Sequence, residues 1–409
     1  MNENGFSRTL TLKNSIYLGL SSMIGAGLFN NIALTAKVSS YSAILGLLLA
    51  STLAFANASS SAQLASLYPQ TGGTYLYAKN TLGNGAANIA GFVFIVGKTI
   101  SCVAIALTLG NYLSPVNSKE FAVLLSFVVF LIGFTGIHKT AKIAKWFVWI
   151  LFGLLAFYTI SIVITPEVSF NIPIAEQFSL NNLLLSGSIW FFAFTGYSRL
   201  ATFGEEVKNP EKIIPTAIFT GLGITVLCYL VISWITLSIV EPNIIMNSKT
   251  PLLIAMDLSS MSAFSFLIVF GSSIAMASVF LALMPGISRI YVAMARDRIF
   301  PRVLSTVHKR FNSAYISEVI VLVTVVIGIY QLDIINSIKL SSFFILIYYS
   351  ITNLSVIKIG RSQRIYSVFI AYYGLLLCLV FAFSLVIPVS YTHLRAHETK
   401  ANLVFRLLL

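Results

Sequence analysis

The stretch "SSMIGAGLF", residues Ser21–Phe29, lies in the middle of an apolar run that is long enough to cross a membrane. Gly25 and Gly27 bracket Ala26 there, and glycine is about 1 kcal/mol less favourable than alanine inside a helix. Because lipid offers no hydrogen-bond partners, a membrane helix can break only where it lines a cavity inside the protein. The stretch therefore predicts a break in the first membrane helix at these three residues.

The composition of the whole chain fits a membrane protein. Of its 409 residues, 57% are hydrophobic and only 10% are charged, against roughly 25% charged in soluble proteins. The sequence therefore predicts an all-α polytopic membrane protein. The basic residues behind the net charge of +13 lie in short loops between apolar runs, which favours topology signals over a nucleic-acid-binding face. We expect no nucleic acid partner, no metal site and no cofactor.

Apolar runs of about 18 residues or more predict membrane helices. We expect eleven, near residues 14–36, 41–66, 86–113, 120–137, 142–165, 182–203, 213–240, 262–296, 314–331, 337–358 and 365–388. If the N-terminus is cytoplasmic, most lysines and arginines lie inside, and the outside loops between spans hold only Lys37, Lys119, Lys249 and Lys339. This bias predicts a multi-pass protein of the plasma (inner) membrane with a cytoplasmic N-terminus.

The last residues depart from this pattern. The stretch 389–409, "VSYTHLRAHETKANLVFRLLL", is largely polar and has no clear helical face. Its segment "SYTHLRAHET" resembles translated sequencing-adaptor read-through, so we expect residues 389–409 to be foreign. Residues 1–388 are expected to form a single transmembrane domain.

A second interruption lies in the sixth run, in "WFFAFTGYSR", Trp190–Arg199, where Thr195 and Gly196 fall in the middle. The first and sixth runs occupy corresponding places in two five-helix halves. We expect repeat one over about 14–165, repeat two over about 182–358 and an extra helix over about 365–388. Because five is odd, the halves enter the membrane from opposite sides. Paired interruptions at matching places of inverted repeats indicate the binding site of a transporter.

The backbone chemistry of such breaks suits an amino acid. Amide N–H groups and the positive dipole end at the start of a half-helix favour a carboxylate. Carbonyl groups on the other side of each break favour an ammonium group. Two breaks can therefore clamp an α-amino acid by backbone groups alone. The alternative is that the small residues only allow tight helix packing.

Four motifs carry a resemblance to a known family. They are Ser21–Phe29, quoted above, "SAQLASLYPQTGGTYLYAKNTLG" (Ser61–Gly83), "FFAFTGYSRLATFGEEVKNPEKIIPTAI" (Phe191–Ile218) and "GISRIYVAMARDRIFP" (Gly286–Pro301). Together they resemble the amino acid–polyamine–organocation (APC) superfamily of amino acid permeases. The resemblance implies the leucine-transporter-type fold, a five-plus-five inverted repeat. Members usually have twelve helices, whereas we expect about eleven here, with the last one missing.

The resemblance also implies roles for backbone groups at the two breaks. The implied substrate-binding residues are Ile24, Gly25, Ala26, Gly27, Phe192, Ala193, Thr195 and Gly196. The carboxylate would lie at the amides of Ala26 and Gly27. The ammonium would lie at the carbonyls of Ile24, Phe192, Ala193 and Thr195. Phe192 also occupies the position where many members place an aromatic gate over the substrate.

Charged side chains provide further candidates. Lys98 lies well inside the third run, and a charge in mid-membrane costs at least about 2.5–3.5 kcal/mol. We therefore expect it to serve substrate selectivity or coupling, with snorkelling to the interface as the alternative. Glu205 and Glu206 end the sixth span close to Lys208 and Lys212 and are candidates for an inner gate. The end of the eighth span holds Arg289, Arg296, Asp297 and Arg298, which we interpret first as topology anchors and second as partners of Glu205 and Glu206 when that gate closes. The alternative there is a solvated helix end, because exposed ion pairs contribute little.

These features together predict a secondary active amino acid permease. It would move a neutral L-amino acid by alternating access, driven by H⁺ or by exchange. A sodium-coupled symporter and a transporter-like sensor without flux remain alternatives. The resemblance places Leu151 where some proton-coupled members carry a lysine, so we expect no lysine-dependent coupling at that position. No nucleotide loop or Ser-His-Asp arrangement is present, so we expect no enzyme activity. The expected partners are the amino acid, H⁺ or Na⁺, and the lipid bilayer.

Overall fold

The computed structural model describes residues 8–39, 43–133, 137–166, 179–308 and 313–386 of the chain. The regular structure of these residues is helical, and their only bridge pairings are isolated ones, between Leu10 and Val207 and between His308 and Ser313. The prediction of an all-α fold is confirmed. The predicted foreign tail, residues 389–409, lies outside the described residues.

Eight helical segments are long and apolar enough to cross a membrane. They are α1 with α2 (Leu12–Met23 and Ala26–Ser39), α3 (Ala43–Leu67), α5 (Asn84–Leu113), α7 (Ile137–Val163), α10 (Pro210–Ile239), α13 (Phe266–Arg296), α15 (Ile334–Lys358) and a last helix, Val368–Val386. Three shorter helices are α6 (Ser118–Gly133), α8 (Leu180–Phe194) and α14 (Tyr315–Gln331). Together these segments correspond to the eleven predicted runs.

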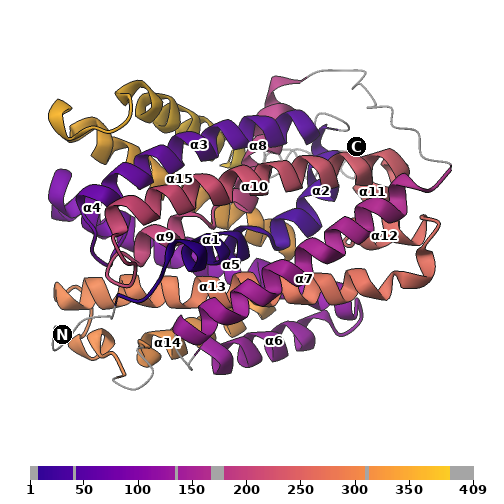
Figure 1. Cartoon of the computed structure of the whole chain (residues 1–409), viewed down its shortest axis with the longest axis horizontal. Coiled ribbons are helices and arrows are strands. Elements are labelled where there is room, and N and C mark those ends of the chain that lie inside the picture. Colours follow the sequence, from indigo (N-terminus) through magenta and orange to yellow (C-terminus); the bar gives the residue numbers. More distant parts are fainter. Residues whose placement is uncertain (1–7, 40–42, 134–136, 167–178, 309–312, 387–409) are drawn as a thin grey trace, which may run out of the picture.

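Short helices connect the long ones. They are α4 (Thr74–Thr81), α9 (Ser198–Thr202), α11 (Pro242–Met246) and α12 (Pro251–Asp257). Figure 1 shows the long helices running along the molecule, with α4 and the N-terminal segment at one end and α11 and α12 at the other. We call these the N-terminal end and the opposite end of the bundle.

The interrupted helices lie at the centre of the bundle. In the first span, 89% of an apolar stretch of 18 residues is buried inside the protein, against 33% of the corresponding stretch in the span that forms most of α7. The helix α1 packs against α7, α10 and α13, and α8 packs against α2 and α3. On α7, Trp146 and Trp149 expose more than half of their surface. Such apolar side chains on the outer helices suit contact with lipid.

Local sequence explains how two connections form. Asp333 caps the start of α15, because its Oδ1 accepts a hydrogen bond from the amide of Asn336 at 2.7 Å. Between α3 and α4 the chain turns at Gly72 and Gly73, whose φ angles are +136° and +53°. Only glycine adopts such angles without steric strain. The turn keeps α4 at the N-terminal end, where α3 also ends.

The N-terminal segment is tied to the turn that follows α9. The carbonyl of Glu206 accepts hydrogen bonds from the amides of Thr9 and Leu10 at 2.8 and 2.9 Å. In return, the amide of Lys208 donates to the carbonyl of Leu10 at 3.0 Å. The start of the first span and the end of the sixth are therefore held together directly.

Candidate binding site between two broken helices

The first helix is broken, as predicted, but the break is slightly displaced. The helix α1 ends at Met23, Ile24 is extended, and α2 begins at Ala26. The carbonyl of Gly25 already accepts from the amide of Leu28 at 2.9 Å, which starts the new helix. Ala26 and Gly27 are therefore the first residues of α2 rather than unwound backbone, because alanine readily re-enters a helix.

The second break confirms the interruption predicted at Thr195 and Gly196. The helix α8 ends at Phe194, residues 195–197 form a turn, and the five-residue α9 follows. The amide of Thr195 still reaches back to the carbonyl of Phe192 at 3.3 Å. The chain then restarts as a helix at Ser198.

Glycine is required because the two breaks touch one another. A Cβ atom added at Gly27 would lie 2.3 Å from the Cβ of Ala193, and one added at Gly196 would lie 2.1 Å from the carbonyl oxygen of Ser22. Neither contact is physically allowed. Tight packing, the alternative explanation of the small residues, is therefore a real feature of the site, and it brings the two interruptions face to face.

The first break presents unused donors. Among the described residues, the amides of Ala26 and Gly27 donate no backbone hydrogen bond. These are orphan N–H groups at the start of α2, where the helix dipole is positive. The geometry is that of an anion site at a helix N-terminus.

The second break presents acceptors that the chain itself occupies. The carbonyl of Thr195 accepts from Lys98 Nζ at 2.7 Å, and the carbonyl of Ala193 accepts from the Tyr229 hydroxyl at 3.1 Å. The carbonyl of Phe192 accepts from the hydroxyl of Thr195 at 2.9 Å. Of the four carbonyls expected to hold an ammonium group, three already have a donor.

Tyr229 is a residue that the sequence reading missed. Its hydroxyl lies 2.7 Å from the carbonyl oxygen of Met23 and 3.1 Å from that of Ala193, so one hydroxyl proton is shared between both breaks. Ser22 adds a second bridge, with its Oγ 2.9 Å from the carbonyl oxygen of Gly196. A tyrosine buried in an apolar span needs a polar partner for its hydroxyl. The position of Tyr229 in such a span was therefore the feature of the sequence that could have identified it.

A small cavity of about 20 Å³ lies between the breaks. Its lining includes Ala26, Gly27, Phe192, Ala193 and Thr195, all of them predicted site residues. This volume accommodates about one water molecule. The structure is therefore occluded, and binding of an amino acid requires the two breaks to move apart.

Lys98 reaches the second break from the middle of α5. Its side chain is only 1% exposed, and its ammonium group remains inside the protein on the carbonyl of Thr195. This arrangement differs from snorkelling, in which the charge would extend to the membrane surface. Lys98 therefore lies directly against the site, at one of the carbonyls expected to hold the substrate ammonium.

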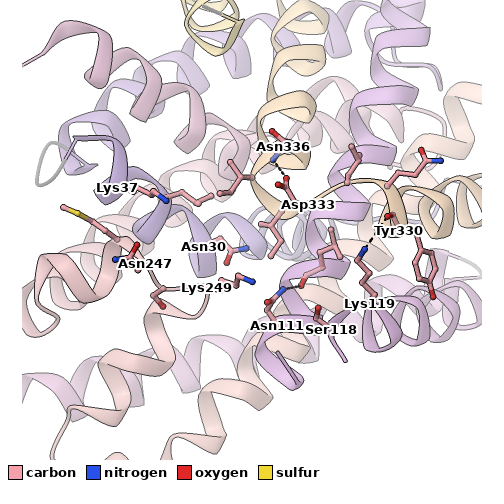
Figure 2. Close-up of a pocket in the computed structure, with 18 residues that line it drawn as sticks. Asn30, Lys37, Asn111, Ser118, Lys119, Asn247, Lys249, Tyr330, Asp333 and Asn336 are labelled. Carbon is pink, nitrogen blue, oxygen red and sulfur yellow. Dashed lines mark hydrogen bonds between the residues drawn. The ribbon is translucent and has the colours of Figure 1, made fainter. Parts of the chain in front are cut away.

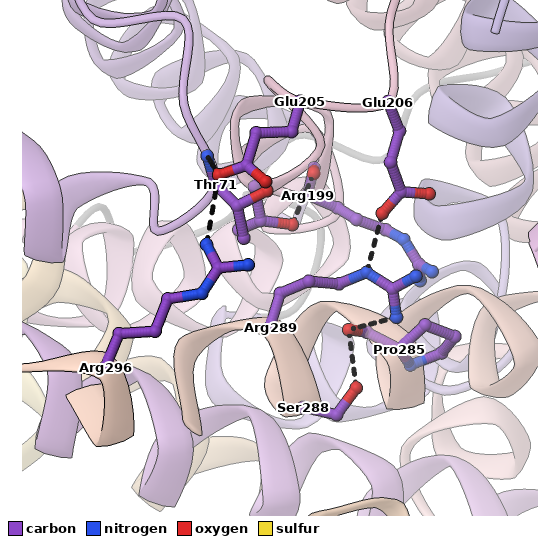
Figure 3. Close-up of polar contacts among 9 residues, drawn as sticks. Thr71, Arg199, Glu205, Glu206, Pro285, Ser288, Arg289 and Arg296 are labelled. Carbon is purple, nitrogen blue, oxygen red and sulfur yellow. Dashed lines mark hydrogen bonds and ion pairs between the residues drawn. The ribbon is translucent and has the colours of Figure 1, made fainter. Parts of the chain in front are cut away.

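At the N-terminal end, ion pairs join the turn after α9 to α13 (Figure 3). Arg289 Nε lies 2.8 Å from Glu206 Oε1, and both side chains are at most 1% exposed. Arg296 pairs with Glu205 at 3.2 Å in a more exposed position. Arg289 and Arg296 are two of the four residues named as candidate gate partners, and the burial of Glu206 differs from the alternative of a solvated helix end.

A third ion pair lies at the same end. Lys79 Nζ is 2.7 Å from Asp297 Oδ1, and the Tyr75 hydroxyl donates to Asp297 Oδ2 at 2.6 Å. Partial burial raises the pKa of the Asp297 carboxyl, but the hydrogen bonds from Lys79 and Tyr75 outweigh burial and lower it overall. Burial, followed by the hydrogen bond to Asp297, raises the pKa of the Tyr75 hydroxyl.

One buried cation was not singled out from the sequence. The Arg199 side chain is 1% exposed and stacks over the Phe203 ring, with its guanidinium carbon 4.9 Å from the ring centre. Its three nitrogens have no hydrogen-bond partner among the described residues. Figure 3 shows it beside Arg289 and Glu206.

Within the same described residues, no cluster of three or more His, Cys, Asp or Glu side chains could hold a metal ion.

A helical membrane bundle with two broken helices meeting over a small central cavity defines the class of secondary transporters. The chain belongs to the amino acid permease family, which it matches over residues 14–400. It is a multi-pass membrane protein and an amino acid transporter rather than an enzyme.

Individual relatives support the same class. An uncharacterized transporter of Mycobacterium tuberculosis is 35% identical over 386 residues, which cover 92% of this chain and 86% of the relative. A vacuolar cationic amino acid transporter of Arabidopsis thaliana is 26% identical over 79% of this chain and 57% of its own length. A branched-chain amino acid permease of Bacillus subtilis is 22% identical over 77% and 73% of the two chains.

Proposed function

We propose that the protein moves a neutral L-amino acid across the plasma membrane by alternating access, with its N-terminus in the cytoplasm. The amides of Ala26 and Gly27 bind the substrate carboxylate. The carbonyls of Ile24, Phe192, Ala193 and Thr195 provide the positions for the ammonium group. The observation that carries this proposal is the contact of two broken helices over one small cavity, with orphan amides on one side and carbonyls on the other.

The choice of a neutral substrate follows from the lining of the cavity. Its side chains are apolar or small, and the nearest cation is Lys98. The names of the two amino acid transporters among these relatives do not agree on a substrate, because one names cationic amino acids and the other branched-chain amino acids. The proposal therefore depends on this chain's own residues, which disfavour a second positive charge in the site.

Lys98 is the proposed link to an energy source, which we take to be a proton gradient or exchange. Its ammonium group occupies the Thr195 carbonyl, so an incoming ammonium group has to displace it or bind beside it. Loss of a proton from Lys98 would remove its charge from the cavity before the substrate arrives. The leucine at position 151 is buried and cannot titrate.

The ion pairs at the N-terminal end supply the proposed inner gate. Glu205 and Glu206 hold the turn after α9 against α13 through Arg296 and Arg289. Opening of the site toward the cytoplasm requires that these pairs separate. The buried pair of Glu206 and Arg289 would be the costlier one to break, because its partners would lose each other without gaining water.

Uptake by the purified protein in liposomes tests the function. Each of the twenty labelled L-amino acids is presented with an imposed proton gradient, with a sodium gradient and with internal amino acid for exchange. The proposal expects uptake of one or more neutral amino acids, stimulated by protons or by exchange. Stimulation by a sodium gradient alone would indicate a sodium-coupled symporter instead. Binding without any flux would contradict the permease and support a sensor.

A further inference from the structure

The opposite end of the bundle holds a pocket of about 650 Å³ that lies outside the cavity between the breaks. Residues of α2, α5, α6, α11, α14 and α15 line it (Figure 2). Its most deeply buried lining residues are Asn30, Leu107 and Asn111, each at most 7% exposed. The pocket is therefore a vestibule with a polar floor, and it is more than large enough for a single amino acid.

The charged side chains of this vestibule are strongly unbalanced. Lys37, Lys119 and Lys249 line it together with one acid, Asp333. All four are exposed, and none of them forms an ion pair within the described residues. The Asp333 carboxylate also accepts a hydrogen bond from the amide of Asn336 at the start of α15. The vestibule therefore carries an excess of two positive charges.

The vestibule and the cavity between the breaks share two of their lining helices, α2 and α5. On α2, Gly27 lines the cavity and Asn30, one turn further on, lines the vestibule. On α5, Ile105 lines the cavity and Leu107 lines the vestibule. Between the two spaces, the Asn30 side-chain amide donates a hydrogen bond to the Thr108 hydroxyl. The vestibule therefore lies further along α2 and α5, toward the opposite end of the bundle, than the cavity.

The balance of buried charge deeper in the protein is also positive. Lys98 holds the Thr195 carbonyl at the cavity, and Arg199 lies buried just beyond the second break. Two buried acids lie near Arg289: Glu206, whose Oε1 is 2.8 Å from Arg289 Nε, and Glu318, which is 1% exposed. The three buried cations Lys98, Arg199 and Arg289 outnumber these two acids by one, so the positive balance of the vestibule is not reversed deeper in the protein.

We propose that this pocket is an electropositive vestibule that selects amino acids by net charge, so that it concentrates anionic amino acids, admits zwitterionic ones and rejects cationic ones. The inference rests on the proposed function, because it assigns a substrate class to the same transport route. A cleft lined by one sign of charge raises the local concentration of oppositely charged solutes by about 10-fold or more. Because the lysines are exposed, dissolved salt screens their charges and so weakens this concentration effect. The Debye screening length is about 10 Å at 0.1 M salt.

Reversal of the vestibule charge tests this directly. The variant carries Lys37→Glu and Lys249→Glu, and the matched control carries Lys142→Glu and Lys145→Glu, which reverse two exposed lysines of α7 outside the vestibule lining. Binding of labelled L-glutamate, L-leucine and L-arginine to purified protein is measured at low and high salt. We expect binding of glutamate to weaken about 10-fold and binding of arginine to strengthen about 10-fold, with leucine changed less than about 2-fold. High salt should shrink both shifts, and the control should show neither.

The outcomes separate this inference from the function itself. Shifts that are equal for the three amino acids, or no shift, would overturn charge selection even if liposome uptake is normal. Charge-ordered binding without uptake of any amino acid would support the vestibule and contradict the permease. Failure of the unmodified protein to bind any of the three amino acids would overturn the inference.

Discussion

The two broken helices differ in how much of their backbone is available. At the first break the amides of Ala26 and Gly27 donate no backbone hydrogen bond among the described residues. At the second break Lys98, Tyr229 and the Thr195 hydroxyl already donate to the carbonyls. One half of the clamp is therefore prepared for a ligand, and the other half is occupied by the protein.

This difference indicates how an occluded site can still be selective. A preformed donor pair requires little rearrangement to accept a carboxylate, so it favours binding by preorganisation. The carbonyl side must exchange an internal donor for the substrate ammonium. We infer that recognition of the carboxylate comes first and that displacement at the second break follows.

The largest expected effect is at the contact between the breaks. Gly27→Ala adds a Cβ atom 2.3 Å from the Cβ of Ala193, so the breaks are forced apart and uptake should fall to background. Gly153→Ala is the control, because nothing lies within 4 Å of its added Cβ. Liposome uptake and the amount of folded protein are measured for both. Normal uptake by Gly27→Ala would show that the close contact is not needed for transport.

The next effect concerns the occupied carbonyl. Lys98→Met removes the donor to Thr195, and a hydrogen bond from a charged group contributes about 1.5–3 kcal/mol. We expect uptake to fall at least about 10-fold and to lose its response to an imposed pH gradient. Lys145→Met, an exposed lysine on α7, should behave as the unmodified protein. A full pH response in Lys98→Met would exclude Lys98 as the coupling residue.

Glu205 and Glu206 anchor the turn after the second break through two ion pairs that differ in burial. Glu206→Gln breaks a pair that is at most 1% exposed and should lower the free energy of unfolding by about 3–5 kcal/mol. Glu205→Gln weakens a pair exposed by 36% and 23% and should cost at most about 1 kcal/mol. Thermal unfolding of both variants gives the order. A larger loss for Glu205→Gln would contradict the burial argument.

The smallest effect is expected at Asp297. Because its pKa is lowered in the folded protein, its contribution to stability is present above the unfolded pKa, near 3.9, and is lost as pH falls through the folded pKa. Asp297→Asn should therefore cost below about 1 kcal/mol at pH 7. The difference from the unmodified protein should vanish in strongly acidic buffer. A difference that stays constant down to that pH would show that the carboxylate charge is not involved.

The spans and both breaks were predictable because they depend on local properties. Long apolar runs mark membrane helices, and paired glycines mark places where the backbone leaves the helix. The sequence placed the first break at Gly25–Gly27, whereas in the structure it lies at Ile24 and Gly25, since Ala26 already begins α2. Lys98 was also identifiable, because a lysine deep in an apolar run is rare.

The partners of these groups could not be predicted, because they come from tertiary packing. Nothing in the sequence near Lys98 indicates the Thr195 carbonyl, which lies in another span. Tyr229 and Arg199 look like ordinary residues of their segments until the fold buries them. From the sequence, the vestibule lysines could be interpreted only as topology signals. They gather in one pocket because α2, α6 and the segment after α11 meet in the folded bundle.

The central claim is that the orphan amides of α2 bind the substrate carboxylate. It is tested most directly by thermal unfolding of the purified protein with each L-amino acid and with the matching L-amino acid amide, which lacks the carboxylate. A ligand that binds the folded state raises the midpoint by mass action. We predict that one or more amino acids raise it and that their amides do not. An amide that stabilises the protein as well as its parent amino acid would contradict the claim.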